Sequence, residues 1–285
     1  MIDALSERIL NLEAPGGPLT RLSVVAPSIV APGEPFALRL AALDANGYPS
    51  IECDAAARAD VGVLAFTTGR PAVGSLDGSA LTDEGLYRIP VSLDGKAFLS
   101  NPIRCRANPT HRIFWGDPHV HTVLSDCHPG RCRSLDFCFV CARHVTGLDW
   151  VCAADHVSNG RTSPGKWRAQ CEAAKLFDDP PRFATILGFE ASLKGGCGGD
   201  NNIYFAGEAE TYADAYDDGD VRTLAQKLAG QDSLIVPHHT TRAGKHGELA
   251  DQQYLGRDLM PAIEIHSKWG TSEYRDNPNA LHDIH

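Results

Sequence analysis

Residues 114–122 read Phe114-Trp115-Gly116-Asp117-Pro118-His119-Val120-His121-Thr122, an aromatic run followed at once by charged and imidazole side chains. The apolar run begins at Ile113 and is typical of a buried strand, and the polar residues start where that strand would end. Alternate residues of a strand point to the same side, so His119 and His121 would direct two imidazoles toward one point. Two such imidazoles would supply half of the ligands of a divalent transition metal. The alternative interpretation is that they are two unrelated polar residues in a loop.

The composition is typical of an ordinary globular chain, and no nucleic-acid partner is expected. Its 285 residues are enough for about two domains, and 43% hydrophobic and 22% charged residues are typical of soluble proteins. A net charge of −10 argues against a nucleic-acid partner, because neutralising phosphates requires clustered Lys and Arg. The same charge does not attract an anionic substrate, so any phosphate chemistry would depend on the charge of a local metal ion.

The N-terminal segment and the cysteines predict a compartment. Residues 1–8 carry acidic side chains and no long apolar core, so we expect neither a signal peptide nor a membrane anchor. Without an export signal, the nine cysteines are expected to be reduced thiols. We therefore predict a cytoplasmic protein that does not associate with membranes.

Residues 1–108 are predicted to form a small all-β sandwich domain. Short apolar runs recur between turn signals such as Asn46-Gly47 and Asp94-Gly95, which is typical of strands joined by tight turns. These runs are residues 22–25, 36–40, 61–66 and 87–91. The segment contains no catalytic constellation, and its expected role is packing, substrate shaping or assembly.

Residues 109–285 are predicted to form an α/β domain. Strands are expected at residues 148–154, 184–189, 233–236 and 261–265, and helices at 135–144, 166–177 and 221–228. Continuous apolar strands that alternate with helices favour a parallel sheet or barrel.

Each predicted strand of this second domain is followed by residues that can bind a metal. They are His119 and His121, Asp155 and His156, Glu190, His238 and His239, and His266. Active sites of α/β barrels lie at the C-terminal ends of the strands, where several loops converge. Scattered surface histidines would not follow strand ends in this way, so we interpret the set as one metal site.

The ordered motifs resemble the PHP (polymerase and histidinol phosphatase) superfamily of metal-dependent hydrolases. Within it, they are most similar to an uncharacterised bacterial branch, the DUF3604 proteins. The resemblance covers roughly residues 112–281 and rests on an ordered set of matching phrases. The phrases are residues 116–122 with Ser125-Asp126, residues 142–156, Gly188-Phe189-Glu190, Pro237-His238-His239, and residues 264–273.

The resemblance implies a distorted (β/α)₇ barrel that holds two or three divalent ions, with Mn²⁺, Zn²⁺ or Fe²⁺ as the candidates. It assigns His119, His121 and Glu190 to a first ion. Glu190 would bridge to a second ion shared with His238. The residues assigned to a third ion are Asp126 and His156.

The chain departs from the family pattern at two places. Asp200 stands where family members often have a His, and a carboxylate is a harder ligand that favours Mn²⁺ or Fe²⁺ over Zn²⁺. The family's last Asp-x-His motif normally comes well beyond the segment that ends at Glu273, and here only Asp283-Ile284-His285 has the right residue types. We therefore expect a fragment that lacks two ligands and the last elements of the barrel.

The implied reaction is metal-assisted hydrolysis of a small phosphorylated molecule, with two ions activating water. His239 is the candidate that protonates the leaving group, with a supporting role behind the ligands as the alternative. Asp117 is a second catalytic candidate that would orient a histidine ligand, or it ends the strand through an Asx turn. Lys268 and Glu273 are candidates for substrate contacts, although a solvated loop is the favoured interpretation.

Some interpretations stay open. Cys127, Cys132, Cys138 and Cys141 cluster after the first motif, and a structural metal or a disulfide competes there with inert thiols, the favoured interpretation. For the function, one alternative is a non-catalytic or degenerate metal-binding fragment. Another is a metal-dependent hydrolase that cleaves a C–N or C–O bond.

Overall fold

The fold consists of two compact units. A computed structural model describes residues 2–125, 127, 130, 132–194, 196–209, 211–217, 219–239, 255–267, 270 and 271. Unit 1 comprises Met1–Gly116, Asp136–Trp150 and Asp179–Ala184. Unit 2 comprises Asp117–Leu135, Val151–Asp178 and Thr185–His285. Unit 1 thus contains the predicted 1–108 domain together with two segments from later in the chain.

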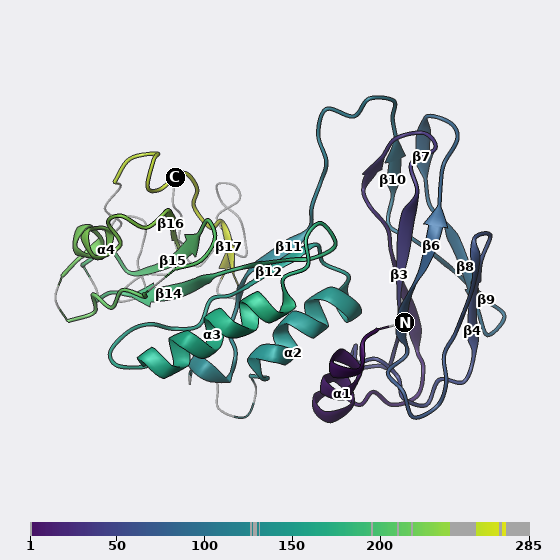
Figure 1. Cartoon of the computed structure of the whole chain (residues 1–285), viewed down its shortest axis with the longest axis horizontal. Coiled ribbons are helices and arrows are strands. Elements are labelled where there is room, and N and C mark those ends of the chain that lie inside the picture. Colours follow the sequence, from purple (N-terminus) through teal and green to yellow (C-terminus); the bar gives the residue numbers. More distant parts are fainter. Residues whose placement is uncertain are drawn as a thin grey trace. The chain divides into compact units, whose positions relative to one another are not determined.

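Unit 1 is built mainly from strands. Its first elements are α1 Ala4–Glu13, β1 Arg21–Val25, β2 Ile29–Val30, β3 Phe36–Leu43, β4 Ala56–Ala59, β5 Gly62–Ala65, β6 Val73–Ser79, β7 Gly85–Tyr87, β8 Pro90–Leu93, β9 Lys96–Leu99 and β10 Ile103–Cys105. The strands form sheets of order β1-β3-β6, β2-β10-β7 and β5-β4-β8-β9 (Figure 1). Asp3 caps α1, because its side chain accepts the backbone N–H of Ser6 at 2.9 Å.

The sheets of unit 1 share one hydrophobic core. In the first half of β3, Phe36, Leu38 and Leu40 are buried while the residues between them are partly exposed, which is the alternation expected of a strand with one face on the core. Val91 and Ile103 from two other sheets are fully buried in the same cluster. The arrangement is consistent with the predicted β-sandwich.

The predicted helix over residues 135–144 is confirmed. It consists of α2 (Leu135–Val140) and the π-helical turn η2 (Cys141–Thr146). The turn ends at Gly147, whose φ of 72° lies in the left-handed region that glycine occupies without a steric penalty.

An ion pair fixes the start of the strands that follow. Arg39 Nη1 donates to the carbonyl oxygens of Gly147 and Leu148 at 2.8 Å each, and Arg39 Nη2 pairs with Asp149 at 2.8 Å. Asp149 also accepts the backbone N–H of Trp115 at 2.9 Å. One carboxylate therefore holds the residue before β11 (Gly116–Val120) close to the residue before β12 (Trp150–Ala153).

The predicted buried strand at residues 113–115 is wrong. These residues are outside any strand and their side chains are 47–65% exposed. The strand β11 begins one residue later, at Gly116, where an added Cβ would lie 2.1 Å from the Trp150 ring. Trp115 is held instead by its indole N–H, which donates to Ser28 Oγ at 2.8 Å. His119 consequently lies within the strand, and His121 directly follows its end.

The metal-site motifs belong to unit 2. Its elements, some beginning at the border of unit 1, are β11 Gly116–Val120, η1 Val123–Ser125, β12 Trp150–Ala153, α3 Pro164–Phe177, β13 Ala184–Ile186, β14 Gly188–Ser192, β15 Asp200–Phe205, α4 Val221–Lys227, β16 Ser233–Pro237, β17 His266–Ser267 and β18 Gly270–Thr271. The larger sheets have the orders β11-β12-β13 and β14-β15-β16. Both predicted helices, at 166–177 and 221–228, are confirmed by α3 and α4.

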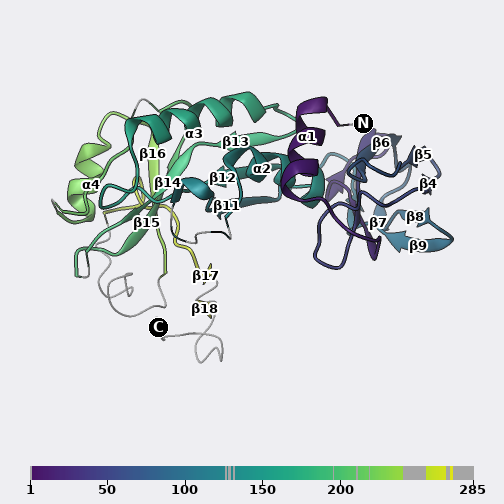
Figure 2. The ribbon, with the colours of Figure 1, turned by 90° about the horizontal axis from the view of Figure 1, so that it is seen from below.

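Helix α3 packs on the strands that carry the site (Figure 2). Ser163 caps the helix, and the Trp167 ring meets Phe189 edge-on with ring centroids 5.8 Å apart. Gln170 is buried, and its Nε2 donates to the carbonyl oxygens of Ala153 and Gly188 at 2.6 and 2.5 Å. One amide thus joins the end of β12 to the start of β14.

The predicted (β/α)₇ barrel is wrong. The strands β14, β15 and β16 pair antiparallel, and no sheet closes into a barrel among the described residues, which form only four α-helices. Residues 193–199 separate β14 from β15 and are too few for the helical crossover that parallel neighbours require. A strand that is buried on both faces reads as a continuous apolar run whether it pairs parallel or antiparallel. The sequence pattern therefore did not determine the direction in which these strands pair.

The predicted strand over residues 261–265 is also wrong, because no strand forms there. The segment still runs beside β16, since Glu264 N donates to the carbonyl oxygen of Pro237 at 3.0 Å. No helix in the described part of the chain is long and apolar enough to cross a membrane.

The buried imidazole of His144 in η2 predicts a pH-dependent stability. Burial lowers its pKa from 6.5 to about 4. The unfolded chain therefore takes up the proton first, and the free energy of unfolding falls as the pH drops from 6.5 toward 4, by up to about 3 kcal/mol. We expect His144→Asn to flatten the pH dependence in this window, measured by urea unfolding at a series of pH values.

The exposed residue His111 of unit 1 provides the matched control. His111→Asn should keep the pH dependence of the parent chain. An unchanged slope in His144→Asn would contradict the assignment of this dependence to His144.

Candidate metal centre

The candidate metal centre lies in unit 2, where several strands end. His119 lies in β11, His121 directly follows it, and His156 follows β12. Glu190 lies in β14, and its backbone N–H donates to the carbonyl of Asp155 at 3.1 Å, while its carbonyl accepts the N–H of Val157 at 2.8 Å. His156 and Glu190 are therefore neighbours across an isolated parallel bridge.

Three ligand atoms form a triangle with the spacing of a metal shell. His119 Nε2 lies 2.9 Å from His121 Nε2 and 3.3 Å from Glu190 Oε2. The third side, from His121 Nε2 to Glu190 Oε2, is 3.1 Å. A tetrahedral ion with bonds of about 2.0–2.1 Å separates its ligand atoms by about 3.3 Å. The three atoms therefore fit one divalent ion.

Glu190 is the central acidic group. Its side chain is 1% exposed, and Oε2 also lies 3.2 Å from His156 Nδ1. Its other oxygen, Oε1, has no hydrogen-bond partner among the described residues. Burial raises the pKa of this carboxyl, but hydrogen bonds from His119 and His121 outweigh burial and hold it well below its usual range. A buried carboxylate requires compensating positive charge, which a cation between these groups supplies.

Glu190 also belongs to a second group of ligand atoms, with His238 and His239. His238 is buried, and the rings of the two histidines lie 3.5 Å apart between centroids. His239 has a φ of 55°, a left-handed conformation that residues other than glycine seldom adopt. Such a backbone persists where surrounding contacts impose it, and it is frequent at functional sites.

Glu264 completes a third group, with His119 and His238. Its carboxylate lies 3.4 Å from His119 Nδ1 and 2.8 Å from His238 Nδ1. Burial raises the pKa of Glu264, but the two histidines outweigh it and lower the value to about 2. Burial likewise lowers the pKa of His119, but Glu190 and Glu264 together raise it to about 9. The carboxylates thus stabilise positive charge at this position.

The sequence did not reveal Glu264 or Asn202 as site residues. Asn202 Nδ2 lies 2.9 Å from His119 Nδ1 and donates to Glu264 Oε2 at 3.1 Å. Glu264 was expected inside an apolar strand, and a single acidic side chain between Ile263 and Ile265 was the one available signal. His266, expected at the end of that strand, is exposed and belongs to none of the ligand groups of the described chain.

Behind the ligands, Asp155 holds the ends of β11 and β12. This buried carboxylate accepts the backbone N–H and the hydroxyl of Thr122 at 2.7 and 2.6 Å, and the hydroxyl of Ser125 at 2.5 Å. Ser125 Oγ lies 2.8 Å from His121 Nδ1 and accepts the N–H of His156 at 3.0 Å. Because the serine proton goes to Asp155, Ser125 Oγ can accept the Nδ1 proton of His121, which orients the ring with Nε2 toward Glu190.

Two other predicted site residues lie close to the ligands. Asp200 is buried, its carbonyl accepts the N–H of His238 at 2.9 Å, and its carboxylate lies 3.8 Å from His239 Nε2. Asp117 Oδ1 accepts the backbone N–H of His119 at 3.0 Å. This is the contact of an Asx turn, the alternative role predicted for Asp117. The predicted residues that lie outside the described chain are Asp126, Lys268, Glu273, Asp283 and His285.

All nine cysteines lie in the described part of the chain, and each is a free thiol. Within the predicted cluster, Cys138 is buried while Cys132 and Cys141 are partly buried. Cys127 is the cysteine that approaches the histidines, with its Sγ 3.6 Å from His121 Nδ1. Burial, and then the neighbouring Cys132, raises the pKa of the Cys127 thiol to about 11.

Comparison with known proteins leaves the family open. No protein-family model matches the chain. An uncharacterized protein of Chlamydia pneumoniae is 23% identical over 195 residues, which are 67% of this chain. The chain spans only 30% of the length of that relative. A superoxide reductase (neelaredoxin) from Ignicoccus hospitalis matches 36% of this chain and 90% of its own, with 15% identity and a TM-score of 0.22, which is too low to support an assignment.

The network behind the ligands predicts an effect on metal affinity. Asp155→Asn keeps the shape of the side chain but weakens its hold on Ser125, and through it on His121 and His156. Losing such an outer partner typically costs 10–100-fold in metal affinity. We expect a loss of that order, measured by titrating the ion-free chain with Zn²⁺ in competition with a chromophoric chelator.

The exposed residue Asp258 of the same unit offers the same chemical change as a control. Asp258→Asn should leave the affinity at the parent value. Equal affinities for Asp155→Asn and the parent chain would refute the positioning role of Asp155.

Proposed function

We propose that the chain is a metal-dependent hydrolase whose histidine and carboxylate cluster holds two or three divalent ions. The observation that carries this proposal is the position of Glu190, a buried carboxylate that belongs to two ligand groups at once. A carboxylate shared in this way sets two cations close together, as in two-metal hydrolytic sites. We propose Mn²⁺, Zn²⁺ or Fe²⁺, because imidazole and carboxylate ligands suit all three.

The proposed ligands divide between the two sides of Glu190. His119 and His121 would hold a first ion with Glu190, and His238 would hold a second. The donor set fits such ions, because the triangle around Glu190 Oε2 has the spacing of a coordination shell. When bound, the ions would activate water and neutralise the charge that builds on the oxygens of the scissile group.

The remaining polar groups would position ligands and move a proton. Glu264 would orient the rings of His119 and His238 through their Nδ1 atoms. We propose that His239 protonates the leaving group, while Asp200 near its ring stabilises the imidazolium form. Asp117 would set the turn of the backbone at His119, since its carboxylate binds the His119 N–H.

We propose a small phosphorylated molecule as the substrate, which is the substrate class implied by the resemblance to PHP-type hydrolases. The net charge of −10 gives the protein no general attraction for phosphate, so the ions would supply it locally. The nine thiols suit a reducing compartment, and we propose a cytoplasmic location.

Removing a ligand tests the proposal. We expect His119→Ala and Glu190→Gln to lose bound metal and to reduce hydrolysis to the uncatalysed level, because each change removes a corner of the first triangle. Metal content would be measured by elemental analysis. Turnover would be measured on a phosphomonoester, a phosphodiester, a carboxylic ester and an amide, with Mn²⁺, Zn²⁺ or Fe²⁺ added.

The exposed residue His266 provides the matched control, and His266→Ala should retain both metal and turnover. Absence of stoichiometric metal in the parent chain would exclude the proposal. Metal binding without turnover on any substrate would favour the non-catalytic alternative. Turnover confined to the ester or the amide would favour cleavage of a C–O or C–N bond.

A further inference from the structure

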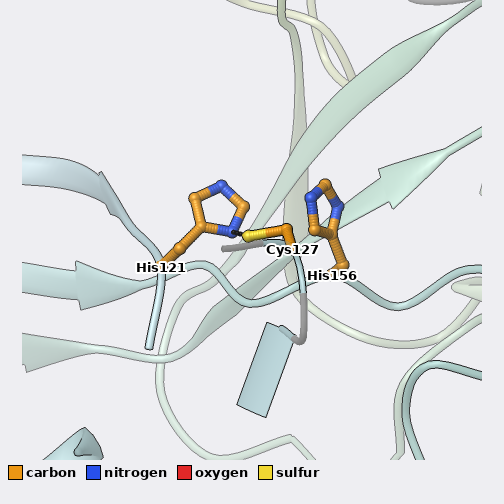
Figure 3. Close-up of side chains that lie close together, drawn as sticks. All are labelled: His121, Cys127 and His156. Carbon is orange, nitrogen blue, oxygen red and sulfur yellow. Dashed lines mark hydrogen bonds between the residues drawn. The ribbon is translucent and has the colours of Figure 1, made fainter. Parts of the chain in front are cut away.

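A sulfur atom lies at the edge of the candidate metal centre. Cys127 Sγ approaches His121 Nδ1 at 3.6 Å, and the side chain of His156 lies beside both (Figure 3). The ligand atoms of these three residues are all within 4.8 Å of one another. The rings of His121 and His156 have centroids 4.6 Å apart. Cys127 therefore belongs to a cluster of three metal-competent side chains, distinct in composition from the groups that contain Glu190 or Glu264.

The spacing matches a shell that contains sulfur. Bonds of about 2.3 Å to sulfur and about 2.0 Å to nitrogen place the two ligand atoms of a tetrahedral ion about 3.5–3.6 Å apart. The distance from Cys127 Sγ to His121 Nδ1 has this value. His156 adds a third candidate ligand atom to the same group, as the shell of a bound ion requires several ligands.

His121 has one nitrogen toward each part of the centre. Nε2 faces Glu190 at 3.1 Å, and Nδ1 faces Cys127 and Ser125. An ion at Nδ1 would displace the ring proton, and the Ser125 hydroxyl would keep its donation to Asp155 and its bond from the His156 N–H. The network behind the ligands therefore tolerates a ligand role for this nitrogen.

A buried polar atom points to a ligand here independently of the sulfur. Glu190 Oε1 is an enclosed atom without a hydrogen-bond partner in the described part of the chain, and the Glu190 carboxylate adjoins this cluster because its Oε2 lies 3.2 Å from His156 Nδ1. The Glu190 side chain is 1% exposed. Enclosed polar atoms of this kind are costly unless a partner satisfies them.

We propose that Cys127, His121 and His156 form a sulfur-containing metal subsite next to the Glu190 groups. This inference rests on the proposed function, because it places a further ion in the same cluster. Binding would release two protons to solvent, one from the Cys127 thiol and one from His121 Nδ1, so that a thiolate and an imidazolate hold the ion. A soft thiolate ligand selects Zn²⁺ or Fe²⁺ over Mn²⁺, so the subsite would differ from its neighbours in metal preference.

Cobalt provides a direct probe of the sulfur ligand. A thiolate bound to Co²⁺ gives an intense charge-transfer band in the near ultraviolet, whereas nitrogen and oxygen ligands give only weak visible bands. We expect the Co²⁺-loaded parent chain to show the intense band. Cys127→Ser should lose this band and keep the visible bands of the neighbouring groups.

Cys171→Ser is the matched control, because this partly buried thiol of α3 donates to the carbonyl of Ala209 away from the cluster. It should retain the intense band. Visible bands without the intense band in the parent chain, or an intense band that persists in Cys127→Ser, would overturn the subsite and leave the proposed function intact. Absence of all Co²⁺ bands would overturn both.

A second measurement needs no variant and decides the question if Cys127→Ser does not fold. The rate of alkylation of Cys127 would be followed by peptide mass spectrometry in the parent chain, with and without Zn²⁺. With free Zn²⁺ at ten times Kd, mass action predicts that alkylation slows about tenfold. Equal rates at Cys127 would refute the subsite, and Cys171 should react equally fast in both conditions.

Discussion

The carboxylate of Glu190, enclosed within β14 and surrounded by imidazoles, is the constraint on which the rest of unit 2 depends. A buried charge is unfavourable unless other charges or hydrogen bonds compensate for it. Here one oxygen atom lies within 3.1–3.3 Å of His119, His121 and His156. These residues come from different segments, so the compensation of one charge requires the ends of β11 and β12 to stay beside the middle of β14.

Two sheets are enough to meet this requirement. The β11-β12-β13 and β14-β15-β16 sheets are joined near the site by the isolated bridge between His156 and Glu190. On the other side of the ligands, Asp155 fixes Thr122 and Ser125, and Ser125 orients the ring of His121. The convergence of these side chains thus arises from strand ends that are organised by a buried carboxylate and a serine hydroxyl.

The sequence predicted which side chains gather at the candidate site better than it predicted the fold. His119, His121, His156, Glu190 and His238 were recognisable because each follows or lies within a short apolar segment, which is a local signal. The barrel was not predictable in this way, because an apolar run does not specify whether its neighbour is parallel or antiparallel. Glu264 and Asn202 reach the site through pairing with β16 and β14, and contacts between residues so distant in sequence leave little local trace.

Gln170 of α3 has a consequence for the spacing of the candidate ligands. The carbonyl groups of Ala153 and Gly188 belong to different sheets, and the buried amide that binds both sets the width of the seam between them. His156 and Glu190 lie three and two residues beyond those carbonyl groups, so the width of the seam controls the span between an imidazole and a carboxylate ligand. A helix side chain outside the candidate ligand groups therefore acts as a spacer between two of their members, and a shorter residue at position 170 would leave the two carbonyl groups without their shared donor.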